Sequence, residues 1–132
     1  MQLIPKTRTL VEHTTRPRIN EAIFKETFDR LEKYRRASRE EIIARLDELD
    51  REWDVERALE THAAIVALAS LGLGKTLHRG FYALTAIVAG FLLQHAVLGW
   101  CPPLPVFRGA GFRTFREIDE ERRVLLDYLR RR

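Results

Sequence analysis

The chain contains a single cysteine, Cys101, among its 132 residues, and this scarcity excludes an internal disulfide. Small secreted domains that cannot build a large core are commonly stapled by several disulfides, so the sequence does not indicate that class. The N-terminal region also lacks an apolar run long enough to form the core of a signal peptide. We therefore expect no cleaved export signal.

Charged side chains are missing from two long stretches, although they make up 32% of the whole chain. Residues 63–74 and residues 80–107 contain no lysine, arginine, aspartate or glutamate. Nearly all of the charges lie before residue 61 or after residue 107. The mean hydropathy of −0.26 therefore averages two very different kinds of segment.

The formal net charge of +4 at pH 7 does not by itself indicate a nucleic-acid-binding protein. Acidic and basic residues are interleaved in residues 39–41 and 120–123, which is typical of a solvated helix face. Residues 72–76 resemble the end of a phosphate-binding loop, but Ala69 stands where that motif has its first glycine. We therefore expect neither nucleic acid nor a nucleotide as a partner.

The first 54 residues predict an arm followed by two amphipathic helices. Residues 1–17 contain two prolines and no apolar period, which predicts an extended arm. From residue 18, apolar side chains recur every three or four positions, and a second stripe follows a capping box formed by Ser38 and Glu41. Residues 18–54 therefore predict a cytoplasmic antiparallel pair of amphipathic helices.

Residues 55–101 predict a hairpin of two membrane-spanning helices. Residues 80–100 are apolar over 21 positions, and a helix of that length spans about 30 Å, the thickness of the hydrocarbon core. Residues 58–77 match this length if Glu60 and His62 lie among the lipid headgroups. Apolar side chains surround both helices and small residues are frequent. Aromatic residues also lie near the proposed boundaries, namely Trp53, Tyr82 and Trp100.

The distribution of cations predicts the orientation of this hairpin. The turn contains Lys75 and Arg79, whereas the two outer flanks together contain six arginines. The positive-inside rule then places both termini in the cytoplasm. The alternative is a soluble bundle whose outer helices bury the central pair, because residues 63–74 of the first helix are also short enough to be a buried soluble helix.

Residues 102–132 predict a cytoplasmic connector and a final amphipathic helix. Prolines 102 and 103 end the second span, since proline has no N–H to donate, and Thr114 with Glu117 forms a second capping box. The fold class is therefore all-α, with amphipathic cytoplasmic helices before and after a two-helix transmembrane hairpin. The wide apolar side of residues 19–53 favours self-association or a partner subunit over a lone hairpin.

The segment from Glu56 to Phe112 resembles the small two-helix transmembrane domain that is fused to rhodanese in YgaP-like inner-membrane sulfurtransferases. The free-standing bacterial form of that domain is more similar still. The matching residues are Glu56-Arg57, residues 72–74, GWCPPLPV at 99–106, GFRT at 111–114 and REIDEER at 116–122. The resemblance implies a multi-pass protein of the bacterial inner membrane with the capacity to dimerise. It implies no reaction, and because no rhodanese domain is present, sulfurtransferase activity does not follow.

One candidate site lies between the two predicted spans. An antiparallel hairpin places Glu60, His62, Gln94 and His95 at one depth, with Cys101 slightly further out. Imidazole and thiolate are ligands for zinc, copper or haem iron, which makes a metal or haem site one interpretation. Hydrogen bonding between polar side chains of paired membrane helices is the other. We predict no metal and no other cofactor.

Cys101 also has two interpretations. A thiol at a membrane interface can accept sulfane sulfur or sense oxidants if its pKa is low, and Arg108 is near enough in sequence to lower it. The chain has no second cysteine to resolve a disulfide, so Cys101 is otherwise a small apolar residue at a helix end. We predict a non-enzymatic inner-membrane protein that anchors or scaffolds a homo-oligomer or a larger membrane complex. The alternative is a sulfur-transfer or redox accessory protein that uses Cys101.

Overall fold

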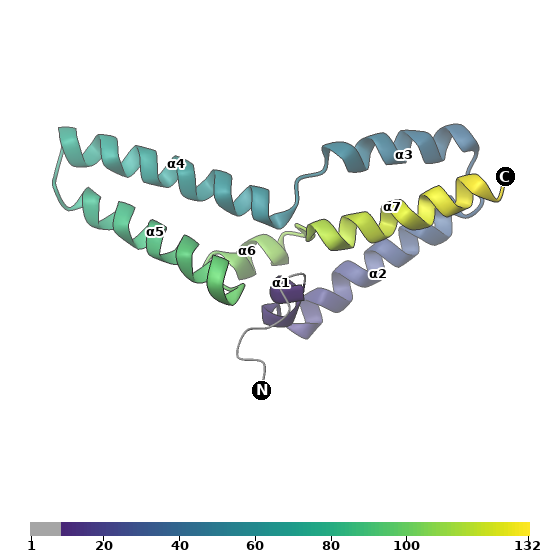
Figure 1. Ribbon diagram of the computed structural model, residues 1–132, viewed down its shortest axis with the longest axis horizontal. Helices are drawn as coiled ribbons and strands as arrows, with labels where there is room; N and C mark the ends of the chain where they lie inside the picture. The colour runs from purple at the N-terminus through teal and green to yellow at the C-terminus, as the bar shows by residue number, and fades with distance from the viewer. Residues whose placement is uncertain (1–8) are drawn as a thin grey trace.

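The computed structural model describes residues 9–132, and all of the regular structure in that part of the chain is helical, which confirms the all-α class. Figure 1 shows two arms that meet at an angle. We call the pair α4 and α5 the apolar arm, and the group α2, α3 and α7 the charged bundle, while α1 and α6 lie at the junction between them. The helices are α1 (Leu10–Thr14), α2 (Pro17–Tyr34), α3 (Arg39–Arg51), α4 (Val55–Thr76), α5 (Phe81–Leu98), α6 (Leu104–Gly109) and α7 (Phe115–Arg130).

The charged bundle is built around α7 rather than from α2 and α3 alone. Both α2 and α3 pack against α7, and the shared core contains Ile42, Leu49, Ile118 and Leu125. The sequence predicted residues 18–54 as an antiparallel pair of amphipathic helices, and in the structure both of these helices pack against α7. An amphipathic helix buries one apolar stripe, and a third stripe closes a core that two facing helices leave open along one side.

The start of α3 and the start of α7 are fixed by the two predicted capping boxes. The Ser38 hydroxyl accepts from the Glu41 N–H, and the Glu41 carboxylate accepts from the Ser38 N–H at 2.6 Å. Thr114 and Glu117 make the same reciprocal pair at the start of α7. Both predictions are confirmed, since the capping box depends only on residues three positions apart.

A buried ion network lies inside the charged bundle. Glu121 on α7 is fully buried, and its carboxylate accepts hydrogen bonds from Arg30 on α2, Arg45 on α3 and Arg113. Arg113 also donates to both carboxylate oxygens of Glu52, at 2.8 and 2.6 Å. One buried carboxylate therefore joins all three helices of the bundle.

Acid is expected to destabilise the charged bundle. Burial alone would raise the pKa of Glu121, but the hydrogen bonds from Arg45 and Arg113 outweigh it, so the pKa is lowered from its ordinary value of 4.5. The pKa of Glu117 is lowered in the same way, since the Arg108 guanidinium outweighs burial. The stabilisation is complete above pH 4.5 and is lost as the pH falls through the lower folded pKa values.

Urea unfolding in detergent, followed by circular dichroism between neutral pH and about pH 3, measures this loss. In the variant Glu117→Gln the dependence on pH is expected to be shallower. An unfolding free energy that does not change over this range, or an equal slope in the variant, contradicts the prediction.

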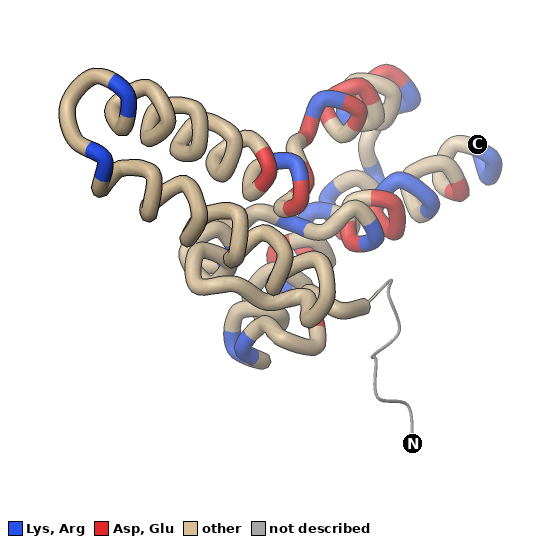
Figure 2. Tube along the Cα trace, turned by 60° about the vertical axis from the view of Figure 1, so that its left-hand side comes forward, with Lys and Arg blue, Asp and Glu red and all other residues tan. Residues whose placement is uncertain are grey.

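The apolar arm projects away from the charged bundle (Figure 1), and its chain has no charged residue along most of its length (Figure 2). α4 and α5 run antiparallel and side by side, and the hydroxyls of Ser70 and Thr85 lie 2.5 Å apart between them. By length and composition, α5 is long and apolar enough to cross a membrane, and it is the one such helix among residues 9–132. α4 contains Glu56, Arg57 and Glu60, so the prediction of two spans is supported for α5 alone.

The junction contains a helix where the sequence predicted an extended arm. Residues 1–8 of that arm lie outside the described part of the chain, but Leu10–Thr14 forms α1, and Pro17 begins α2. Leu10 and Val11 are buried, and the Thr14 hydroxyl donates to the Gly99 carbonyl oxygen at 2.8 Å. A single helical turn shows no readable apolar period, which is why the sequence pattern missed it.

Gly99 ends α5 in the left-handed region, with a φ of +74°. A Cβ added there would lie 2.5 Å from the Leu10 Cβ and 3.0 Å from the Leu10 carbonyl carbon. Gly111 has a φ of +98° but no atom within 4 Å of an added Cβ. The two glycines therefore share backbone strain and differ in available space.

Gly111→Ala is expected to lower the free energy of unfolding by about 1–2 kcal/mol, from the left-handed backbone alone. Gly99→Ala is expected to lower it by about 1–3 kcal/mol more, because α1 must also move. Urea unfolding of both variants in detergent measures the difference. Equal losses would mean that α1 does not press on the end of α5.

Candidate functional site

His95, in the last turn of α5, is the buried titratable residue of the apolar arm. It is 6% exposed, and its Nε2 lies 2.7 Å from a carboxylate oxygen of Glu56 in the first turn of α4. The sequence placed Glu60 at the same depth as His95, but Glu60 is exposed and the carboxylate that contacts His95 is that of Glu56. Glu56 and Glu60 lie one turn apart on the same helix face, so the sequence alone does not distinguish them.

The other predicted members of this cluster do not join His95 in a ligand set. His62 is exposed, and its ring meets the edge of Phe107 at 5.7 Å, while Gln94 is half-buried. Within residues 9–132, no group of three or more histidine, cysteine, aspartate or glutamate side chains is arranged to hold a metal ion. The four residues predicted at one depth therefore do not form a metal centre in the described part of the chain.

A small apolar cavity does bring three of the predicted residues to one place. Its volume is about 210 Å³, and it lies between α4, α5 and the segment after α5. His62, His95 and Cys101 line it, together with apolar residues that include Leu59 and Phe91. Histidine and cysteine thus share a cavity whose walls are otherwise hydrocarbon.

Cys101 is buried at the junction rather than exposed at an interface. It is 4% exposed and packs with Val11, Val55, Leu59 and Leu104. Burial raises the pKa of the Cys101 thiol, which lowers the fraction of reactive thiolate at neutral pH. Both observations favour the interpretation of Cys101 as a small apolar core residue.

Arg108 does not act on the thiol as the sequence suggested. It is 1% exposed and donates to both carboxylate oxygens of Glu117, at 2.7 and 2.9 Å. Its remaining donors reach the Phe112 carbonyl oxygen, the Asn20 side chain and the Thr15 hydroxyl. Arg108 thus joins α1, α2, α6 and α7. Sequence patterns could not predict these contacts, because the partners of Arg108 are up to 93 residues away.

The folded protein is expected to resist alkylation of Cys101. Iodoacetamide reacts with the thiolate, and burial limits both the access and the ionisation of this thiol. We expect the modification followed by mass spectrometry to be at least about a hundredfold slower in the folded protein than in urea. Equal rates would restore the reactive-thiol interpretation.

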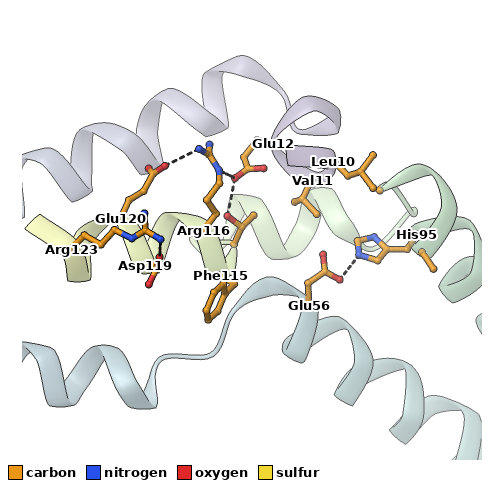
Figure 3. Close-up of a pocket in the computed structure, with 13 residues that line it drawn as sticks. Leu10, Val11, Glu12, Glu56, His95, Phe115, Arg116, Asp119, Glu120 and Arg123 are labelled. Carbon is orange, nitrogen blue, oxygen red and sulfur yellow. Dashed lines mark hydrogen bonds and ion pairs between the residues drawn. The ribbon is translucent and has the colours of Figure 1, made fainter. Parts of the chain in front are cut away.

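A larger pocket lies at the junction, and we call it the junction pocket (Figure 3). Its volume is about 680 Å³, and its walls come from α1, the start of α4, the end of α5 and the first turns of α7. Glu12 and Arg116 lie on one side of it and the His95–Glu56 pair on the other, with Leu10 and Val11 between them (Figure 3).

Two buried side-chain atoms in the described chain have no hydrogen-bond partner, and both belong to residues that line the junction pocket. They are Oε2 of Glu12 and Nδ1 of His95. The other oxygen of Glu12 accepts from the Thr114 hydroxyl at 2.9 Å and from Arg116 at 3.2 Å. Sequence analysis missed Glu12 because it falls in the segment predicted to be an extended arm.

No family model matches the chain, and no curated protein and no solved structure has detectable similarity to it. The chemistry of the junction is therefore inferred from its own residues.

Proposed function

We propose that the protein is a non-enzymatic membrane anchor, in which the apolar arm inserts into a bilayer and holds the charged bundle at the surface. The observation that carries the proposal is the exposure of α5. Only 6% of its 18-residue apolar span is buried by the rest of the chain. A soluble protein rarely leaves such a large continuous apolar surface in water, since each exposed square ångström costs about 25 cal/mol.

The exposed side chains surround the apolar arm instead of forming one stripe. A helix that is apolar on all sides suits a lipid environment better than the surface of a soluble bundle. The hydroxyls of Ser70 and Thr85 contact each other between the helices, as polar groups do when water is absent. Along the apolar arm and its turn, the large apolar residues that are more than half exposed are Ile65, Leu68, Leu77, Ile87, Leu93, Val97 and Leu98.

The soluble-bundle alternative required the amphipathic helices to cover the central pair. The charged bundle instead packs on itself, and the apolar arm projects from it with its sides uncovered (Figure 1). Because α4 lies antiparallel to α5 along the arm, insertion of α5 carries α4 with it. We therefore propose a transmembrane hairpin in the inner membrane of a bacterium, with both termini in the cytoplasm.

Charge supports this orientation. The turn of the arm carries only Lys75 and Arg79, while the opposite end adjoins many charged residues (Figure 2). We also propose that the chain is related to the free-standing YgaP-like domain. We further propose that it assembles into a homo-oligomer or a larger membrane complex. The sulfur-transfer alternative has no observation in its favour, because Cys101 is buried and its pKa is raised.

Extraction of membranes at alkaline pH tests the anchor directly. We expect the full chain to stay in the membrane pellet after a carbonate wash. The variant Ile87→Arg is expected to be lost from the pellet, because inserting an arginine at a helix centre costs about 2.5–3.5 kcal/mol. The matched control Ile43→Arg changes an exposed apolar residue of α3 and leaves the protein in the pellet. Wild-type protein that is soluble without detergent would overturn the proposal.

Labelling of single cysteines tests the orientation. In a Cys101→Ala background, His78→Cys lies in the turn and Glu40→Cys lies near the start of α3. A membrane-impermeant maleimide added to intact cells is expected to label the first variant and not the second. The reverse pattern would place the termini outside.

A further inference from the structure

The end of the charged bundle that lies away from the apolar arm has a large excess of positive charge (Figure 1). The end of α2 and the start of α3 contribute four cations, the end of α7 contributes three, and residues 33–39 and 130–132 contain no acidic residue. All seven side chains are exposed. We call them the basic tip, namely Lys33, Arg35, Arg36, Arg39, Arg130, Arg131 and Arg132.

The fold brings these two runs together although they lie far apart in sequence. A guanidinium nitrogen of Arg132 donates to the Arg35 carbonyl oxygen at 3.0 Å, across 97 positions. The pKa of the Glu41 carboxyl is lowered chiefly by its hydrogen bonds with Ser38. The charges of Lys33 and Arg132 lower it further, so both runs lie near the start of α3. The basic tip is thus one surface and not two separate segments.

Few of the cations in the basic tip are neutralised within the described chain. Arg35 contacts Glu32 at 3.8 Å, and Arg131 contacts Asp127 at 2.9 Å. The other five form no ion pair with residues 9–132, whereas the arginines in the middle of the bundle pair with a buried carboxylate. Because like charges that gather on one surface repel one another, such a surface is favoured where it meets an anionic partner.

The direction of the charged bundle selects that partner. In Figure 1 the bundle leaves the junction across the axis of the apolar arm instead of continuing that axis. With the arm across the bilayer, the bundle therefore runs along the cytoplasmic face of the membrane, and the basic tip lies beside the headgroups. This step rests on the proposed function. The cytoplasmic leaflet carries anionic lipids, and its negative surface attracts clusters of lysine and arginine near a membrane helix.

We propose that the basic tip binds anionic phospholipids of the cytoplasmic leaflet, such as phosphatidylglycerol. The protein then contacts the bilayer at two places, through the apolar arm and through the far end of the charged bundle. Six of the seven cations are arginines, whose guanidinium groups donate two parallel hydrogen bonds to a phosphate. A nucleic acid offers the same phosphate chemistry, but to reach the tip it would have to approach a negatively charged membrane surface.

Quenching of a fluorophore near the basic tip by lipid headgroups tests the proposal. In a Cys101→Ala background, Ala44→Cys provides the labelling position, because Ala44 is exposed and lines the same groove as Lys33 and Arg36. The full chain is placed in nanodiscs in which a fixed fraction of the phosphatidylcholine carries a nitroxide on its headgroup. When phosphatidylglycerol replaces half of the remaining lipid, we expect the ratio of quenched to unquenched protein, resolved by fluorescence lifetime, to rise at least about tenfold.

Salt and a carbonate wash separate the possible outcomes. Because the attraction is electrostatic, about 0.5 M salt is expected to abolish most of the rise. Quenching that does not respond to phosphatidylglycerol, in protein that stays in the membrane after a carbonate wash, overturns this inference and leaves the anchor intact. Protein that is lost in the wash contradicts the anchor, and with it the position of the tip.

A triple variant assigns the response to the basic tip. Arg36→Gln, Arg39→Gln and Arg130→Gln together remove three unpaired cations, and the rise is expected to fall to about twofold or less. The matched control removes the same charge from exposed positions outside the tip and keeps the full rise. Its substitutions are Lys25→Gln, Arg51→Gln and Arg123→Gln. Equal responses of the two variants overturn the assignment to the tip, and the wild-type response to phosphatidylglycerol decides if either variant fails to fold.

A short DNA duplex distinguishes the lipid from a nucleic acid. It is added to protein in nanodiscs that contain phosphatidylglycerol, at the same phosphate concentration as that lipid, and is expected to leave the quenching unchanged. If the duplex releases the tip from the membrane, the partner is a nucleic acid and the lipid assignment is wrong.

Discussion

Replacing Glu121 with alanine is expected to lower the free energy of unfolding by about 3–5 kcal/mol, which is a large part of the stability of a small domain. The Glu121 carboxylate is fully buried and accepts from Arg30, Arg45 and Arg113. Without it, three guanidinium groups face one another across the charged bundle. Their remaining carboxylate partners are more exposed, namely Glu52 for Arg113 and Arg45, Glu48 for Arg45, and Glu26 for Arg30. Urea unfolding in detergent, followed by circular dichroism, measures the loss.

Glu48→Ala is the matched control for this experiment. Glu48 pairs with the same Arg45, at 2.9 Å, but its side chain is 64% exposed, and its removal is expected to cost less than about 1 kcal/mol. Similar losses for the two variants would show that Glu121 is not the centre of the network. A loss near zero for Glu121→Ala would show that the bundle tolerates the arginines by moving them into water.

Arg108→Lys is expected to be almost as damaging, with a loss of about 3–5 kcal/mol, although it keeps the positive charge. The planar guanidinium of Arg108 makes five hydrogen bonds to four different residues. A lysine ammonium has three donors and cannot reach both oxygens of Glu117 in parallel. The buried groups around it are then left without partners, and thermal unfolding in detergent is expected to begin at a lower temperature.

Arg35→Lys provides the comparison for Arg108→Lys. The Arg35 side chain is 68% exposed and its pair with Glu32 is long, at 3.8 Å, so the change is expected to be within about 0.5 kcal/mol. If Arg108→Lys lowers the free energy of unfolding by as little as this, the contacts of Arg108 at the junction do not hold the apolar arm and the charged bundle together.

The sequence predicted those features of the fold that depend on neighbouring residues. The capping boxes at Ser38 and Thr114 need only a partner three positions away, and the apolar stripes of α2, α3 and α7 follow from helical periodicity. The apolar stripes do not determine which of these helices pack against each other. The place of α7 against both α2 and α3 depends on contacts between segments up to 91 residues apart, such as the pair Arg30 and Glu121.

The candidate site was predictable in its parts and not in its arrangement. Periodicity brought His95 opposite the first turns of α4, but the depth at which the helices meet selects Glu56 over Glu60. Cys101 was expected at an interface because its neighbours in the core come from α1, α4 and α6, and α1 is too short to show a helical period. Glu12 was missed for the same reason, and with it the junction pocket.

The charged bundle is discontinuous in sequence, since α2 and α3 precede the apolar arm and α7 follows it. During translation, Glu121, the acidic residue shared by Arg30 and Arg45, is therefore added after both helices of the arm have been synthesised. Until then the ion pairs open to Arg30 and Arg45 are those with Glu26, Glu48 and Glu52, which lie close to them in sequence. Translation order thus delays completion of the charged bundle until both helices of the apolar arm have been made.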